Sequence, residues 1–296
     1  MIFRYPISLQ GRQFWRTLLI LGRTSNLPTV WSNCLAGWLL GNGGSLWRLC
    51  WVMAGGSLLY VGGMFLNDAF DEEFDRRHRP ERPIPSKAIQ PKEVWFYGVI
   101  WLLLGLFCLV WIGPATAVFS LCLVVSILLY DAVHKLITFG PVLMSACRFF
   151  LYLLAASAGE NGVTGLALWS AIVLAAYIIG LSYLARQESR RGVLSLWPCF
   201  VMASPVLLAN FVNGPDYRGR FYLCATVLVA WVLYALRHLF WHQISRNIGR
   251  SVSGLLAGIV LVDLLAVAGG PAPGLWLVFV ALFGAALVFQ RFIPAT

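Results

Sequence analysis

The chain alternates between long apolar stretches and short polar ones. Because a helix that crosses a bilayer needs about 20 mostly apolar residues, this pattern predicts ten membrane spans. They lie near residues 24–41, 46–66, 94–112, 115–131, 139–158, 165–185, 194–212, 221–240, 252–268 and 273–291. The fourth span is short, and the seventh, which contains Pro198 and Pro205, or one of the last two could be broken or partly re-entrant. Nine spans therefore fit the pattern as well as ten.

Basic residues gather on alternate connections between the predicted spans. Lys and Arg occur in the connections at 67–93, 132–138, 186–193 and 241–251. The connections at 42–45, 113–114, 159–164 and 269–272 contain neither residue, and only Arg218 and Arg220 at 213–220 break the alternation. Because Lys and Arg favour the cytoplasmic side, we expect the N-terminus and the first basic connection to be cytoplasmic. The expected location is the cell (inner) membrane.

Composition supports the same class of protein. Hydrophobic residues make up 59% of the 296 residues and charged residues 11%, against about 25% charged in soluble domains. The net charge of +10 comes from residues at the ends of apolar stretches, so it indicates membrane orientation and not a nucleic-acid partner. No long linker divides the chain, which predicts a single all-α membrane domain over residues 1–296.

One polar stretch, NDAFDEEFDRRHRPERPIPSKAI, follows the second apolar run and begins at Asn67. On a continuous helix, Asp68, Asp71 and Asp75 would share one face within about two turns. Like charges this close are tolerated when a divalent cation lies among them. Carboxylate oxygens with few His or Cys residues nearby suit Mg²⁺, Mn²⁺ or Ca²⁺ better than zinc.

Basic residues follow the three aspartates immediately. They are Arg76, Arg77, Arg79, Arg82 and Lys87. Together they carry enough positive charge to hold a phosphorylated ligand against a metal ion. The alternative interpretation is an ordinary solvated loop of mixed charge between two spans.

Some polar side chains fall inside predicted spans, where a charge costs about 2.5–3.5 kcal/mol on insertion scales. Arg148 lies near the middle of its span, and Asn33 and Asp263 lie within theirs. We expect them to face a cavity or one another. Arg148 favours a functional role because its permanent charge needs an anionic partner, whereas Asn33 and Asp263 could equally serve as hydrogen bonds between helices. His134 is expected to be solvated.

These residues resemble motifs of the UbiA superfamily of intramembrane prenyltransferases. NDAFDEEFD is similar to that family's N-D-x-x-D-x-x-x-D motif, and RPIPS resembles its R-P-(L/I)-P-S-G signature, with Lys87 where Gly is usual. Arg23 and Asn33 lie around the first span as in the family, and Tyr130 with Lys135 resembles a Y-x-x-x-K element with one residue extra. The segments RTSNLPTVWSN and YLARQES resemble a branch from metabolite-export gene clusters.

The resemblance implies a bundle of nine or ten helices around a cavity that opens toward lipid. It implies that Asp68, Asp71 and Asp75 hold Mg²⁺ and that these aspartates and Arg148 are catalytic. Together with the charges described above, the predicted substrate-binding residues are Arg23, Asn33, Asn67, Arg79, Arg82, Tyr130, Lys135, Arg186, Gln187, Glu188 and Arg190. The implied reaction ionises a prenyl diphosphate and transfers the isoprenyl group to an aromatic, polar-lipid or metabolite acceptor within the membrane.

The chain departs from the family at the second acidic motif. Family members usually carry D-x-x-x-D at the end of the sixth span, whereas this chain reads YLARQESRRG, with Glu188 as the only acid. We therefore expect one Mg²⁺ per diphosphate, with Arg186 and Arg190 neutralising the pyrophosphate directly. An exposed charge cluster is the alternative for this segment.

Two other functions remain open from the sequence. A transporter or export component could use the same fold, with Arg148 and Asp263 lining a path. An enzyme could also cyclise or rearrange an isoprenoid without an acceptor. Release of pyrophosphate from a labelled prenyl diphosphate, with or without a conjugate, separates the three possibilities.

Overall fold

The computed structural model describes residues 7–187, 195–212, 218–240, 248–270 and 273–295, and these ranges contain helices and turns but no strand. The α-helices are α1 (Ile7–Leu21), α2 (Leu27–Leu40), α3 (Leu46–Phe70), α4 (Glu72–His78), α5 (Pro91–Val110), α6 (Pro114–Val133), α7 (Gly140–Ser157), α8 (Gly165–Arg186), α9 (Trp197–Val201), α10 (Ser204–Val212), α11 (Arg218–Phe240), α12 (Ile248–Ala266) and α13 (Trp276–Phe292). The predicted all-α membrane bundle is confirmed.

Seven of the described helices, α3, α5, α6, α7, α8, α11 and α12, are long and apolar enough to cross a membrane. The segments α2, α9–α10 and α13 are shorter. The predicted break in 194–212 is confirmed, since α9 ends at Val201 and α10 begins at Ser204. Pro205 accounts for the break because it cannot donate a helical hydrogen bond and its ring would clash with the carbonyl of the preceding turn. The concern that the fourth span is short was wrong, because α6 has 20 residues.

The segment just before α2 and the segment just after α13 meet at one face of the molecule. The Asn26 side chain, just before α2, donates to the carbonyl of Ala295, which follows α13, at 2.9 Å. A chain that returns to its starting face has crossed an even number of times. With α9–α10 taken as one crossing, this contact favours ten segments over nine.

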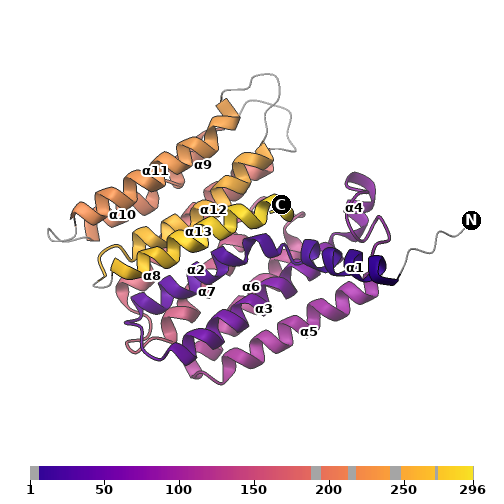
Figure 1. The fold of residues 1–296 in the computed structure, drawn as a ribbon, viewed down its shortest axis with the longest axis horizontal. Coiled ribbons are helices and arrows are strands. Elements are labelled where there is room, and N and C mark those ends of the chain that lie inside the picture. The colour runs from indigo at the N-terminus through magenta and orange to yellow at the C-terminus, as the bar shows by residue number, and fades with distance from the viewer. Residues whose placement is uncertain (1–6, 188–194, 213–217, 241–247, 271–272, 296) are drawn as a thin grey trace, which may run out of the picture.

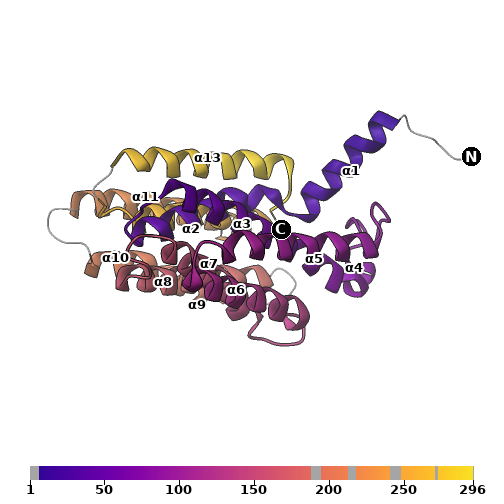
Figure 2. The same ribbon diagram turned by 90° about the horizontal axis from the view of Figure 1, so that it is seen from below.

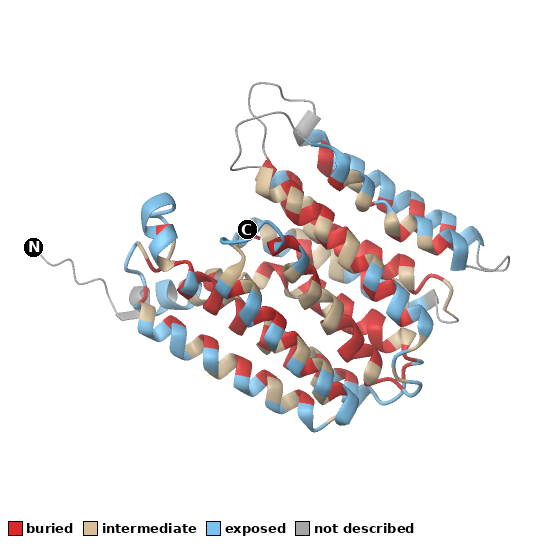
Figure 3. Ribbon diagram, turned by 180° about the vertical axis from the view of Figure 1, so that it is seen from behind, coloured by how far each residue is buried: buried red, intermediate tan, exposed pale blue. Residues whose placement is uncertain are grey.

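Helix α2 lies in the middle of the bundle, where it packs against α3, α7, α12 and α13. Figure 1 shows α3, α5 and α6 on one side of it and α10 to α13 on the other. Figure 2 shows α1 leaving the bundle at the end where α4 lies. Most residues of α2 and α12 are buried, whereas the outer face of α5 is exposed, as expected for a surface that contacts lipid (Figure 3).

Helices α3 and α5 approach each other closely at glycines. A Cβ atom on Gly62 would lie 2.9 Å from the carbonyl oxygen of Gly98, and one on Gly105 would lie 2.9 Å from that of Gly55. Small residues at such contacts let helix backbones approach in a membrane, where lipid tails are as apolar as Leu. This contact fixes the position of α3, whose last turn carries the acidic motif.

The segment after α4 folds back against α3 and α5. Ile84 and Ile89 are buried in a small cluster with Leu21 and Phe65. Lys87 has φ of 61°, in the left-handed region that favours glycine. This backbone conformation explains why Gly is usual at this position of the R-P-(L/I)-P-S-G signature.

We expect Gly62→Val to destabilise the protein strongly, because its side chain would meet backbone atoms of α5 that cannot move aside. Overpacking of this kind typically costs about 1–3 kcal/mol. The measurement is the thermal unfolding midpoint in detergent micelles. The control is Gly284→Val in α13, where an added Cβ meets no atom within 4 Å. Equal midpoints for the two variants would contradict the close α3–α5 contact.

Candidate active site

The acidic motif lies where α3 meets α4. Asp68, Asp71 and Asp75 are all buried, with 6%, 7% and 2% of their surface exposed. The prediction of one continuous helix was wrong in detail, because α3 ends at Phe70 and Asp71 forms the junction with α4. The backbone bonds from Asp71 to Asn67 and from Asp75 to Asp71 keep the helical spacing across the junction.

Arg82 lies between two of the three aspartates. Its Nη1 donates to Asp75 Oδ2 at 2.8 Å and to Asp68 Oδ1 at 3.1 Å. Arg23 adds a second guanidinium, with Nη2 3.3 Å from Asp68 Oδ1 and 3.4 Å from Asn67 Oδ1. Two cations therefore neutralise Asp68 and Asp75 in a place where unpaired charge would be costly.

Asp71 faces the residues that follow α6. Lys135 Nζ lies 2.7 Å from Asp71 Oδ1, and His134 Nε2 lies 3.7 Å from Asp71 Oδ2. Burial lowers the pKa of His134 although Asp71 acts in the opposite direction, so Lys135 is the main cation here. The expectation that His134 is solvated was wrong, because its side chain is only 13% exposed and its ring stacks on Tyr130.

A fourth carboxylate, which the sequence analysis did not assign to the site, joins the cluster. Asn67 Nδ2 donates to Asp131 Oδ1 at 3.1 Å. Asp131 was overlooked because a single acid near the end of a span carries no motif. Two carboxylate oxygens, Asp131 Oδ2 and Asp75 Oδ1, are buried without a hydrogen-bond partner.

These orphaned oxygens and the hard donor set fit Mg²⁺. Within the described residues, however, no group of three or more His, Cys, Asp or Glu side chains is arranged to hold a metal ion. Arg82 bridges Asp68 and Asp75, and Lys135 is paired with Asp71. A metal ion can therefore bind all three aspartates only when these cations move away.

The end of α8 differs from the expectation for the second motif. The Arg186 guanidinium donates to the backbone carbonyls of His134 at 2.6 Å, Thr138 at 2.9 Å and Ile137 at 3.3 Å. These bonds hold the α6–α7 loop to the end of α8. The contact of Arg186 with a diphosphate stays a prediction, and it would require these hydrogen bonds to break.

Two of the remaining residues of that prediction, Gln187 and Arg79, belong to the described part of the chain. Gln187 is also occupied, through hydrogen bonds with the backbone nitrogen and oxygen of Ser195. Glu188 and Arg190 lie outside the described residues. Arg79 is exposed at the end of α4.

Arg148 and Asn33 are not brought to the aspartates but form a deeper polar layer. Arg148 Nη1 donates to Asn33 Oδ1 at 2.7 Å, and Asn33 Nδ2 donates to Asp263 Oδ2 at 2.7 Å. The expectation that these buried side chains face one another is confirmed. The direct catalytic role predicted for Arg148 lacks support from this placement.

Tyr60 lies between the deeper layer and the acidic motif. Its ring is 5.7 Å from the Arg148 guanidinium, and its hydroxyl donates to the carbonyl of Arg23 at 3.4 Å and accepts from Asn26. No sequence pattern marks this residue, because a single Tyr in an apolar helix usually belongs to the packing or to the membrane interface.

The fold and the cluster of buried aspartates and cations describe an intramembrane helical protein with a polar site at one end. The chain matches the profile of the UbiA prenyltransferase family over residues 26–294, and it belongs to that family.

Similar proteins come from archaea. The chain is 31% identical over 144 residues to a digeranylgeranylglyceryl phosphate synthase of Thermococcus gammatolerans, covering 45% of this chain and 52% of that protein. It is 39% identical over 67 residues to a protein of the same name from Pyrococcus horikoshii, covering 22% of this chain and 24% of that protein. The matches therefore span a quarter to half of these relatives.

Solved structures share the fold. One, from work on digeranylgeranylglyceryl phosphate synthase in membranes, is 20% identical with a TM-score of 0.60 over 86% of this chain and 98% of that one. Another, a UbiA homologue from Archaeoglobus fulgidus bound to GPP and Mg²⁺, is 15% identical with a TM-score of 0.52 over 94% and 97%.

We expect Arg186→Gln to loosen the α6–α7 loop that carries Lys135. Hydrogen bonds from charged donors are worth about 1.5–3 kcal/mol, so amide hydrogen exchange across residues 134–139 should rise about tenfold or more. Hydrogen exchange followed by mass spectrometry measures this, and activity should fall in parallel. Lost activity with unchanged exchange would instead support a direct contact between Arg186 and the substrate.

Proposed function

We propose that this protein is a Mg²⁺-dependent prenyltransferase that moves an isoprenyl group from a prenyl diphosphate to a lipid acceptor within the membrane. One observation carries the proposal. The three buried aspartates of the motif, at one end of the bundle, lie within 3.3 Å of three cations, Arg23, Arg82 and Lys135. A site for a metal–diphosphate complex needs both sets of charges.

The aspartates are the proposed metal ligands. Asp68, Asp71 and Asp75 supply oxygen donors of the type that Mg²⁺ prefers, and Asp75 Oδ1 is buried without another partner. Bound Mg²⁺ supplies charge neutralisation for the departing pyrophosphate. Because Mg²⁺ is usually held by one or two carboxylates together with substrate phosphates, we expect it to bind together with the diphosphate.

The basic residues are the proposed diphosphate ligands. In the proposed complex Arg23, Arg82 and Lys135 turn from carboxylate oxygens to phosphate oxygens, and each of these side chains is partly exposed in the free protein. Arg pairs with phosphate through two parallel hydrogen bonds. These contacts strengthen as the allylic carbon–oxygen bond breaks and its electrons pass to the pyrophosphate, which favours ionisation.

Other residues complete the proposed site. Asn67 orients Asp131 and also accepts from Arg23. Tyr130 stacks on His134 beside Lys135, and Arg79 is exposed where a diphosphate would approach. By the distribution of Lys and Arg, we place this end of the bundle on the cytoplasmic side of the cell membrane.

A polar lipid is the proposed acceptor. The relatives that share 31% and 39% identity over part of their lengths are named digeranylgeranylglyceryl phosphate synthases. In this reaction a hydroxyl oxygen of the acceptor bonds to the allylic carbon and loses its proton as pyrophosphate leaves. An aromatic acceptor is the alternative that the product analysis below distinguishes.

We expect Asp68→Asn and Asp71→Asn to reduce turnover by at least about 100-fold. Mutation of a residue that only hydrogen-bonds to a metal ligand lowers metal affinity or activity about 10–100-fold, and loss of a ligand itself should cost more. Asp75→Asn should have a smaller effect. The assay follows pyrophosphate release and the prenylated product from labelled geranylgeranyl diphosphate. The control is Glu73→Gln, which alters an exposed acid on the same helix α4.

Each outcome of this assay separates the candidate functions. Pyrophosphate and a lipid conjugate support the proposal, and an aromatic conjugate changes the acceptor. Pyrophosphate without a conjugate indicates cyclisation or rearrangement, and no release indicates transport. Full activity in the Asp68 variant would contradict the proposed role of Asp68 as a metal ligand.

A further inference from the structure

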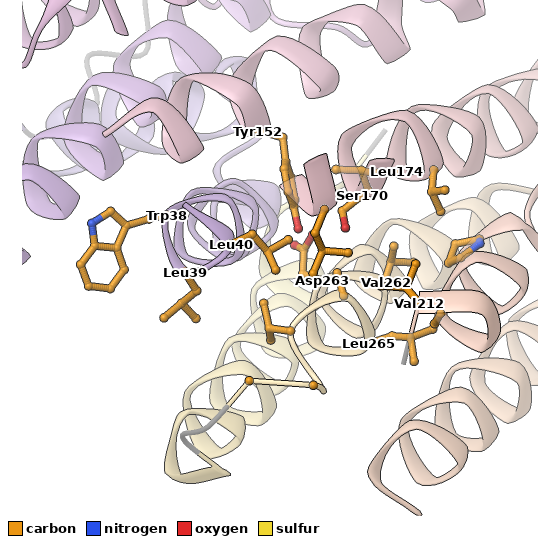
Figure 4. Close-up of a pocket in the computed structure, with 18 of the residues that line it drawn as sticks. Trp38, Leu39, Leu40, Tyr152, Ser170, Leu174, Val212, Val262, Asp263 and Leu265 are labelled. Atoms are coloured by element: carbon orange, nitrogen blue, oxygen red, sulfur yellow. The ribbon is translucent and has the colours of Figure 1, made fainter. Parts of the chain in front are cut away.

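A cavity of about 660 Å³ lies far from the acidic motif, between the last turns of α2, the first half of α8, α10 and the end of α12. Figure 4 shows it with side chains from these helices. None of the motif aspartates or their cations lines it. Asn26, near the motif, and Trp38, at the cavity, lie at opposite ends of α2.

Most of the cavity wall is apolar. Leu39, Leu40, Leu174, Val212, Val262 and Leu265 line it. Its volume falls in the range of about 300–1,000 Å³ that is usual for small-molecule sites. Such a wall can accommodate a hydrocarbon chain.

Three residues of the cavity lining carry a buried polar atom without a partner: Trp38, Tyr152 and Asp263. The Trp38 indole points away from the other two, which meet at the inner wall (Figure 4). Asp263 and Tyr152 are 0% and 1% exposed, and Asp263 Oδ1 and the Tyr152 hydroxyl form no hydrogen bond. Both residues line the cavity, and Figure 4 shows their oxygens pointing toward each other beside the Ser170 hydroxyl. Buried polar atoms in native proteins are nearly always paired, so this pair points to a ligand that supplies the missing contacts.

The opposite side of Asp263 is held firmly. Asp263 Oδ2 accepts from Ser32 Oγ at 2.5 Å and from Asn33 Nδ2 at 2.7 Å, and Asn33 Oδ1 accepts from Arg148. These bonds leave Oδ1 as the carboxylate oxygen that faces the cavity. The site is thus built by residues from α2, α7 and α12.

Charge balance restricts the ligand. Arg148 and Asp263 offset each other through Asn33, and within the described residues neither forms an ion pair with a further charged side chain. An ammonium or carboxylate ligand would leave a net charge in this low-dielectric layer, which is unfavourable. A neutral hydroxyl matches both orphaned atoms, because it can donate to Asp263 Oδ1 and accept from the Tyr152 hydroxyl.

We propose that this cavity is a second ligand site, which binds a neutral long-chain alcohol with its hydroxyl between Asp263 and Tyr152 and its chain along the leucine-rich wall. The site is separate from the proposed diphosphate site and does not depend on the proposed function. Its occupancy is therefore testable whether or not the protein transfers prenyl groups.

The test uses hexadecanol that carries a diazirine in its chain, with the full-length protein in lipid nanodiscs. After illumination, peptide mass spectrometry locates the label. We expect saturable labelling of α10 and α12, and about fivefold or more weaker binding of the methyl ether, which cannot donate a hydrogen bond. The matching amine should also bind more weakly than the alcohol.

Two variants make the test specific. Tyr152→Phe removes only an unpartnered hydroxyl, so the protein should fold normally while the alcohol binds about fivefold more weakly. Ala266→Phe, in the cavity wall, should abolish labelling by filling the space. Neither variant should alter pyrophosphate release at the acidic motif.

Three results would overturn the proposal. Equal labelling by the alcohol and its methyl ether, or unchanged binding in Tyr152→Phe, would show that the cavity holds hydrocarbon without recognising a hydroxyl. Loss of labelling when geranylgeranyl diphosphate is added would show that the cavity is the far end of the diphosphate site and not a second site.

Discussion

Burial of charge inside a membrane protein is the constraint on which the site depends. A charged side chain in an apolar surrounding must be paired or solvated. The free-energy cost of removing an unpaired charge from water is larger than the stabilisation from most other single interactions. In this chain the pairing joins helices that are distant in sequence. Arg23, between α1 and α2, pairs with Asp68 in α3, and Lys135 brings the end of α6 to Asp71 at the α3–α4 junction. The charges of the site therefore also hold its helices together.

This arrangement has a consequence for ligand binding. The cations that neutralise the aspartates in the free protein are also the groups that a diphosphate needs. A metal ion alone would leave the cations unpaired, and a diphosphate alone would leave the aspartates unpaired. When both bind, the aspartates pair with the metal ion and the cations pair with the diphosphate. Arg186 contributes indirectly, since it fixes the loop from which Lys135 reaches the cluster.

The sequence predicted those features that depend on neighbouring residues. The spacing of Asp68, Asp71 and Asp75, the basic run that follows them and the proline break before α10 are all local patterns, and the structure retains them. Among contacts between distant segments, only the one that joins Arg148, Asn33 and Asp263 was predicted, from the cost of unpaired polar groups inside a span. The hydrogen bonds of Arg186 are one example of a contact that was missed, because its place in the sequence does not reveal that backbone carbonyls about 50 residues away accept from it. Asp131 had no motif to mark it.

The most direct measurement is the binding of Mn²⁺, a paramagnetic substitute for Mg²⁺, followed by electron paramagnetic resonance with and without an unreactive prenyl thiodiphosphate. We expect the wild-type protein to bind one ion per analogue and to bind the ion only weakly alone. Arg82→Gln removes the cation that bridges Asp68 and Asp75 and leaves only Arg23 on Asp68. It should bind the ion alone more tightly but the analogue more weakly, unlike the exposed control Arg77→Gln. Equally tight binding of Mn²⁺ to the wild-type protein with and without the analogue, or an Arg82 variant that behaves as the wild type, would contradict the account.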